Sequence, residues 1–163
     1  MSKLIRHFSS GQTWFVTVIT AKRLPVLLNN SDLLLRALIR TERKVSFTIL
    51  AWVILPDHIH ALISSDAAVI PNIVHRMKHS FTCQFKKRHR SKAPVWQNRY
   101  WDHMIRSDKD LKNHIDYIHY NPVRHGFAES PQQWRLSTFG RYLKQGYYFP
   151  DWGQPTKSRL RVL

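Results

Sequence analysis

The chain contains little cysteine and little glycine, and both shortages narrow the class of protein. Cys83 is the single cysteine among 163 residues, which excludes an internal disulfide and a cysteine-based zinc finger. We expect Cys83 to be a small buried residue on a helix, and we expect a cytoplasmic protein because one unpaired thiol fits a reducing compartment. With five glycines and 43% apolar residues, the chain can bury one core and needs no second domain.

Acidic residues are also scarce, which leaves a large positive charge. Ten Asp and Glu residues face 26 Lys and Arg residues, so the net charge is +16 at pH 7. An excess of this size predicts a polyanionic partner, either nucleic acid or an anionic membrane surface. The membrane is the poorer candidate, because no apolar run is long enough to span a bilayer and residues 1–10 lack the apolar centre of a signal peptide.

Strand-like and helix-like segments alternate along the chain, without repeats or low-complexity tracts. The patterns predict strands at residues 13–20, 47–55, 58–63 and 95–106, the second and third forming a hairpin around Pro56 and Asp57. They predict helices from Asn30 or Ser31 to about Lys44, from Pro71 onward, and from Ser107 to a stop near Asn121, before Pro122. We expect one α+β unit.

Two histidines begin the second arm of the predicted hairpin. Side chains alternate between the faces of a strand, so His58 and His60 point the same way while Ile59 points into a core. Two neutral imidazoles on one face can hold a divalent cation if a third ligand arrives from elsewhere in the fold. Taken alone, such a pair is more typical of two surface histidines.

The helix after Ser107 carries a polar stripe beside its apolar face. At about 100° per residue, His114, Tyr117 and Asn121 fall on one flank of that face, whereas Tyr120 points away from the core. A catalytic side chain on a helix would occupy such a border, half held by packing and half facing a cleft. For Tyr117 alone, a half-buried tyrosine with its hydroxyl on water is the more common reading.

The second helix and the loop after it form the most basic segment of the chain. We interpret this segment as a phosphate-contacting surface in preference to a solvated helix face. The aromatic residues Trp96, Tyr100 and Trp101 follow it and could stack on bases, but each is expected in the core. The candidate nucleic-acid-binding residues are Lys3, Arg6, Arg76, Lys78, Lys86, Lys87, Arg88, Arg90 and Arg99.

Several motifs together resemble a known family. They are residues 52–60 (Trp-Val-Ile-Leu-Pro-Asp-His-Ile-His), 96–103 (Trp-Gln-Asn-Arg-Tyr-Trp-Asp-His), 116–126 (Asp-Tyr-Ile-His-Tyr-Asn-Pro-Val-Arg-His-Gly), the Thr-Trp-Phe opening and the segment from Trp134 to Phe139. The combination resembles the small one-tyrosine HUH transposases of bacteria, which are IS200-like. More closely, it is similar to the REP-associated tyrosine transposases, and the likeness covers nearly the whole chain.

This resemblance implies a ferredoxin-like α+β fold, with helices packed on a central antiparallel sheet. We expect a catalytic domain over residues 1–127 and a C-terminal extension over residues 128–163, which either gates the site or caps the core. The resemblance also implies an enzyme that cleaves single-stranded DNA at or near hairpin-forming repeated palindromes, and rejoins it in transposition, through a 5′-phosphotyrosine on Tyr117.

The resemblance also implies a catalytic metal ion. His58 and His60 would hold it with Asn121 as third ligand, and His114 and His103 are lesser candidates for that place. Mg²⁺ is expected from availability, although imidazole suits Mn²⁺ better. A monomer is expected, with a dimer open because the insertion-sequence relatives exchange tyrosine helices. Two alternatives stay open: a non-catalytic single-strand-binding module with a ferredoxin-like sheet, and a nonspecific metal-dependent nuclease.

Overall fold

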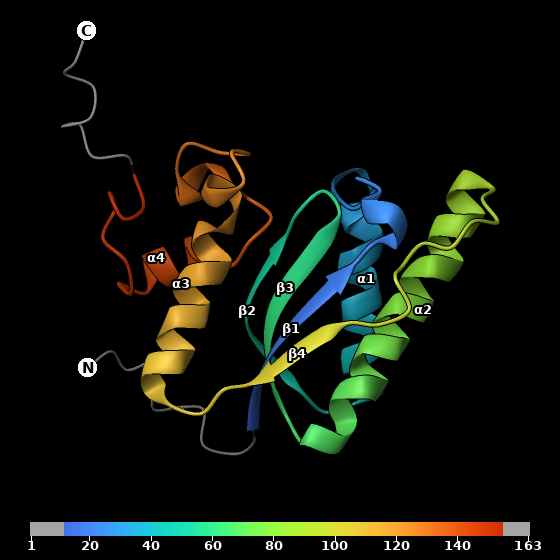
Figure 1. Cartoon of the computed structure of the whole chain (residues 1–163), viewed down its shortest axis with the longest axis horizontal. Helices are drawn as coiled ribbons and strands as arrows, with labels where there is room; N and C mark the ends of the chain where they lie inside the picture. Colours follow the sequence, from blue (N-terminus) through green and yellow to red (C-terminus); the bar gives the residue numbers. More distant parts are fainter. Residues whose placement is uncertain (1–11, 155–163) are drawn as a thin grey trace, which may run out of the picture.

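A computed structural model describes residues 12–154 and places a four-stranded antiparallel sheet between two layers of helices (Figure 1). The strands are β1 (Gln12–Ile19), β2 (Thr48–Ile54), β3 (His58–Ser65) and β4 (Trp101–Met104), in the spatial order β2-β3-β1-β4. With one helix after β1 and one after β3, this order is that of a ferredoxin-like fold, so the predicted α+β class is confirmed.

The predicted hairpin forms one side of the sheet, with β2 at the edge. Strands β2 and β3 pair with Ile54 opposite Ile59 and with a register shift between Ile49 and Ala51. On its other side β3 pairs with β1, where His60 lies opposite Thr17. Residues of β3 alternate between two cores, because Ile59 and Ile63 pack on one face of the sheet and Leu62 packs on the other.

Helices α1 (Ser31–Glu42) and α2 (Ile70–His89) cover one face of the sheet. The helix predicted from Pro71 onward is present as α2, and its residues Ile73, Met77 and Phe81 are buried against the sheet. Cys83 is exposed, so the expectation of a buried thiol was wrong. Two positions after the buried Phe81, it lies on the opposite side of the helix.

Helices α3 (Asp108–Arg124) and α4 (Phe139–Lys144) lie on the other face. Ser107 caps α3 by accepting a hydrogen bond from the backbone N–H of Asp110, as predicted. The predicted stop at Asn121 was wrong, because α3 continues through Pro122 to Arg124. Asn121 and Pro122 are both buried, so packing against the sheet outweighs the usual effect of proline on a helix.

The fourth strand is much shorter than predicted. Between residues 95 and 106 only Trp101–Met104 pairs with β1, and Trp96 adds one isolated bridge to Thr20. Trp96 is buried and Tyr100 packs against the α1/α2 core, as expected. Trp101 is 54% exposed, so its expected place in the core was wrong. Because β4 is an edge strand, its outer side leaves room for such a side chain.

The described part of the C-terminal segment packs against the α3 side of the sheet. Phe139, Tyr142 and Tyr148 are buried in the same core as Ile118 of α3. Ser137 forms a bridge with Val53 of β2, which is the other edge strand. Residues 131–152 therefore cap a core and cover an edge, rather than lying over the histidine pair. Within residues 12–154 no helix combines the length and apolar character needed to cross a membrane.

Candidate active site

Strand β3 places His58 and His60 together on the α3 face of the sheet. Their ring centroids are 4.8 Å apart, and both side chains are buried. Ile59 between them packs into the opposite core, which is the alternation that the sequence predicted. The position of the pair at the start of β3 puts it at the turn end of the β2–β3 hairpin.

A neighbouring oxygen orients each imidazole. His58 Nδ1 donates to the Asp57 carboxylate at 2.6 Å, and His60 Nδ1 is 2.8 Å from the Thr17 hydroxyl oxygen. Binding Nδ1 in this way leaves Nε2 available as a metal ligand, an arrangement typical of metal-binding histidines. His60 Nε2 is buried and has no hydrogen-bond partner within residues 12–154.

Both histidines are held in the neutral form that a metal ion requires. Burial lowers the pKa of His60 to about 3, and the positive charges of nearby groups act in the same direction. Burial also lowers the pKa of His58, with the Asp57 carboxylate opposing the shift. At neutral pH each ring therefore carries a lone pair in place of a second proton.

Asn121 is the third residue proposed for the metal. It is completely buried on α3, one turn after Tyr117, and neither Oδ1 nor Nδ2 of its amide finds a partner among the described residues. Leaving a buried polar atom unpaired costs about 1–3 kcal/mol, so such atoms are rare unless a ligand supplies the missing hydrogen bond or coordinates to them. An unpaired amide oxygen and the unpaired His60 nitrogen fit a cation held between β3 and α3.

Tyr117 lies beside the histidine pair. The centre of its ring is 5.3 Å from that of His60 and 5.8 Å from that of Phe15, and the guanidinium carbon of Arg124 lies 5.5 Å from it. A cavity of about 490 Å³ opens here, which we call the tyrosine cavity. Its lining residues are Phe15, Thr17, His60, Trp101, Asn113, His114 and Tyr117.

Tyr120 is separate from this cavity. It is 42% exposed and its ring lies 6.1 Å from that of Trp152. The structure therefore places the two tyrosines of α3 on different sides of the helix, as the helical phase predicted.

A second group of potential ligands lies next to the tyrosine cavity. His103 Nε2 is 3.0 Å from one carboxylate oxygen of Asp110, and His114 Nδ1 is 3.0 Å from the other. Their potential ligand atoms all lie within 4.8 Å of one another, so these three residues could hold a metal ion. His103 and His114 were lesser candidates to complete the pair on β3, but here both contact Asp110. No local sequence pattern pointed to Asp110 as a ligand, because its contact with His103 forms only when α3 packs beside β4.

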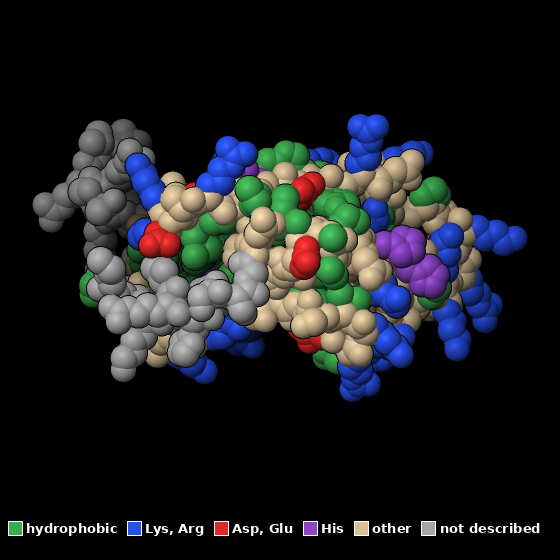
Figure 2. All heavy atoms as spheres, turned by 90° about the horizontal axis from the view of Figure 1, so that it is seen from below, with side chains coloured by type: hydrophobic (Ala, Val, Ile, Leu, Met, Phe, Trp, Pro, Cys, Tyr) green, Lys and Arg blue, Asp and Glu red, His purple; other side chains and the backbone are tan. Residues whose placement is uncertain are grey.

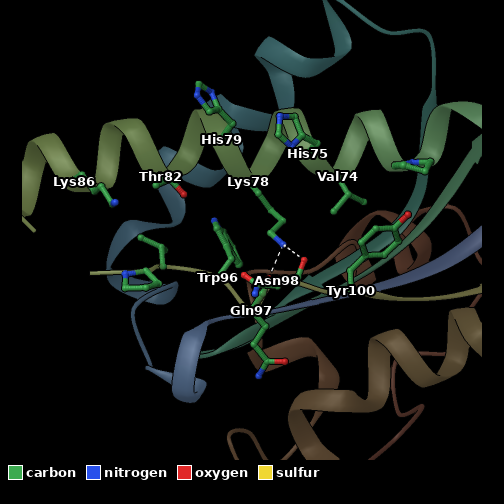
Figure 3. Close-up of a pocket in the computed structure, with 13 residues that line it drawn as sticks. Val74, His75, Lys78, His79, Thr82, Lys86, Trp96, Gln97, Asn98 and Tyr100 are labelled. Atoms are coloured by element: carbon green, nitrogen blue, oxygen red, sulfur yellow. Dashed lines mark hydrogen bonds between the residues drawn. The ribbon is translucent and has the colours of Figure 1, made fainter. Parts of the chain in front are cut away.

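Most of the predicted nucleic-acid-binding residues lie on the opposite side of the sheet. Lys78 and Lys86 line a cavity of about 610 Å³ between α2 and residues 94–100, which we call the α2 cavity (Figure 3). Arg76 lines a groove between α1 and α2 together with Arg40 and Arg43, two residues that the sequence analysis did not select. Figure 2 shows Lys and Arg side chains projecting around histidines at this end of the molecule.

The remaining predicted residues differ in their surroundings. Arg88 donates to both carboxylate oxygens of Asp32 on α1, at 2.9 and 2.6 Å, so its charge is already paired. Lys87, Arg90 and Arg99 are exposed, as is the paired Arg88. Lys3 and Arg6 lie outside the described residues.

Comparison with known proteins shows which family the chain resembles. Residues 10–121 match the family model described as transposase IS200 like. A REP-associated tyrosine transposase of Escherichia coli (strain K12) is 37% identical over 157 residues, covering 93% of this chain and 91% of that protein. A protein of Haemophilus influenzae is also 37% identical, over 166 residues and 94% of each chain.

One solved structure resembles the whole fold. A REP-associated tyrosine transposase bound to a REP hairpin superposes with a TM-score of 0.79 and 33% identity, covering 100% of this chain and 99% of that one. The similarity therefore includes the C-terminal segment as well as the part that the family model covers.

Proposed function

The chain belongs to the IS200-like transposase family, and we propose that it cleaves and rejoins single-stranded DNA at or near hairpin-forming repeated palindromes. One observation carries the proposal: Tyr117 lines the same cavity as His60, on the side of the sheet where Asn121 is buried with an unpaired amide. The REP hairpin bound by the solved relative supports a palindromic DNA as substrate.

In the proposed reaction, Tyr117 is the nucleophile. Its phenolic oxygen attacks a phosphorus atom of the DNA strand and loses its proton to solvent. The new oxygen–phosphorus bond leaves a 5′-phosphotyrosine, while the bond from phosphorus to the 3′-oxygen breaks and that oxygen is protonated. Because the covalent intermediate keeps a phosphodiester bond, the step can be reversed or can join a different 3′-hydroxyl without a nucleotide cofactor.

We propose that His58, His60 and Asn121 hold a divalent cation, Mg²⁺ or Mn²⁺, which would draw charge from the scissile phosphate when bound. Two imidazole nitrogens with one amide oxygen suit Mn²⁺ better than Mg²⁺. Asp57 and Thr17 fix the orientation of the two rings through their Nδ1 atoms. The Arg124 guanidinium, over the face of the Tyr117 ring, adds a positive charge where phosphate oxygens would lie.

We propose that one chain is sufficient for catalysis. The tyrosine and the histidine pair of a single chain already lie together, with 5.3 Å between the ring centres of Tyr117 and His60. A dimer that exchanges its tyrosine helices would not need this proximity within one chain. A monomer is therefore the simplest active form.

A labelled hairpin oligonucleotide tests the function directly. The protein is incubated with the oligonucleotide and Mn²⁺ or Mg²⁺, and the products are separated on a denaturing gel. A 5′-phosphotyrosine attaches the 3′ fragment to the protein, so a label at the 3′ end should move with the protein and a label at the 5′ end should not.

The same gel separates the alternatives. A binding module without catalysis would leave the oligonucleotide intact, and a nonspecific nuclease would cut it without any label on the protein. Either result would contradict the proposed function.

A further inference from the structure

The α2 cavity lies across the sheet from Tyr117 and has no part in the proposed reaction. Figure 3 shows α2 along one wall, with residues 94–100 opposite it. At about 610 Å³ the cavity is in the size range of sites that bind small molecules. The lining residues on which the argument depends are Lys78, Thr82, Lys86, Trp96, Asn98 and Tyr100.

The walls of this cavity combine aromatic surface with hydrogen-bond donors. Trp96 is buried with its ring 5.1 Å from that of Phe81, yet its indole N–H has no partner among the described residues. Lys78 Nζ donates to the backbone oxygens of Gln97 and Asn98, at 2.7 and 3.3 Å, which fixes the ammonium group at the cavity wall. The fixed ammonium group favours a ligand that offers acceptor atoms.

The α2 cavity and the tyrosine cavity meet at one edge of the sheet. Tyr100 lines the α2 cavity, whereas the next residue, Trp101, lines the tyrosine cavity with Tyr117. Trp101 begins β4, an edge strand, and no further strand lies beyond it within residues 12–154. A flexible polymer could therefore cross this edge and occupy both cavities at once.

We infer that the α2 cavity receives one unpaired base of the DNA strand whose nearby phosphate lies at Tyr117. This inference rests on the proposed function, because it takes single-stranded DNA as the ligand. Tyr100, which is only partly buried, offers aromatic surface against which a base can stack, and Lys78 and Lys86 supply positive charge for the adjoining phosphate.

Binding of strands that lack single bases tests this inference. The probes are fluorescent hairpin oligonucleotides of the REP class with single-stranded tails, each with an abasic site at one tail position. EDTA keeps them intact, and affinity is measured by anisotropy. For the natural protein, one position should lower affinity about tenfold when its base is removed, the size expected for losing one stacked base.

Two matched variants assign that loss to the cavity. Thr82→Phe places a ring in the cavity, so removal of the base should no longer matter. Cys83→Phe adds the same ring at the next residue of α2, which is exposed and does not line the cavity, and should keep the tenfold loss. Asn98→Trp fills the cavity from the opposite wall and replaces Thr82→Phe if that variant does not fold.

The outcomes separate this inference from the proposed function. If removing each base costs the same in the natural protein and in the filled variants, the base site is overturned, even when the covalent adduct forms normally. If one base matters in the natural protein and not in the filled variants, yet no adduct forms, the site stands and the proposed nucleophilic reaction fails.

Discussion

The two faces of the sheet differ in where their polar groups lie. Under α1 and α2 the core is built almost entirely from aliphatic and aromatic side chains, and the charges lie outside it. Under α3 the buried residues include His58, His60, His119 and Asn121. Burying polar groups costs stability unless they are paired or have a ligand, so their concentration on one face marks that face as the place for chemistry. The other face presents the basic side chains that are proposed to contact DNA.

Removing the phenolic oxygen of Tyr117 should cause the largest loss of activity on the α3 face. Tyr117→Phe keeps the ring and its packing, so folding and DNA binding should survive. Formation of the covalent adduct should fall by about 10⁴-fold or more, as expected when a nucleophile is lost. The adduct is measured on the denaturing gel with 3′-labelled hairpin DNA.

Tyr120→Phe is the matched control, because Tyr120 lies outside the tyrosine cavity and packs against Trp152. It should keep normal activity. If Tyr117→Phe is active and Tyr120→Phe is inactive, the nucleophile is Tyr120, on the other side of α3.

Substituting the ligands should show which histidines serve catalysis. His60→Ala should lower cleavage about a hundredfold or more while hairpin binding changes little, because the basic surface provides most of the affinity. Asn121→Ala should have a smaller effect that added Mn²⁺ partly restores, as expected for one lost ligand of three. Cleavage rates are measured over a range of Mg²⁺ and Mn²⁺ concentrations, and EDTA should reproduce the loss.

His103→Ala provides the comparison, because His103 contacts Asp110 in the second ligand group and not the pair on β3. We expect nearly normal cleavage and metal dependence. If His103→Ala is as defective as His60→Ala, the catalytic metal is held by His103, Asp110 and His114 instead.

Charge reversal on the α1/α2 face should change binding without changing the chemical step. Arg43→Glu combined with Arg76→Glu alters two residues of the groove between α1 and α2. Each lost phosphate contact should reduce the slope of log affinity against log salt by about 0.7 for a single strand. Anisotropy titrations at several salt concentrations measure that slope.

Arg88→Glu is a useful contrast, since Arg88 is already paired with Asp32. It should change the slope less than either groove residue does. The same slope in the natural protein and in the groove variant would show that this face does not meet the DNA backbone.

The smallest effect concerns how the C-terminal segment is joined to α3. The Tyr148 hydroxyl donates to Asp116, the residue before Tyr117, and is 2.9 Å from His119 Nδ1. Tyr148→Phe removes both contacts and should lower the free energy of unfolding by about 1–3 kcal/mol. Tyr147→Phe is the control, because the buried Tyr147 hydroxyl has no partner among the described residues. Urea denaturation of both variants decides whether the connection is structural.

Much of this arrangement could be predicted from local sequence patterns. The alternation of side chains along a strand placed His58 and His60 on one face, and the helical period placed Tyr117 apart from Tyr120. Both patterns act over a few residues and depend only on backbone geometry. The type and order of the main elements follow from similar patterns, and the family resemblance supplied the proposed nucleophile and the proposed third ligand.

Other features depend on contacts between distant parts of the chain. Trp101 is exposed because β4 is an edge strand, and α3 continues through Pro122 because that residue is buried. Arg88 is not free for DNA, since α1 brings Asp32 to it across 56 positions of sequence.

Which side chains share a face follows from the local period of a strand or a helix and can be predicted from the residues alone. Which faces meet depends on tertiary packing. The packing of α3 on β3 brings Tyr117 beside His60, and the packing of residues 94–100 along α2 forms the α2 cavity at the far side of β4. Such contacts join positions far apart in the chain, so no local period encodes them.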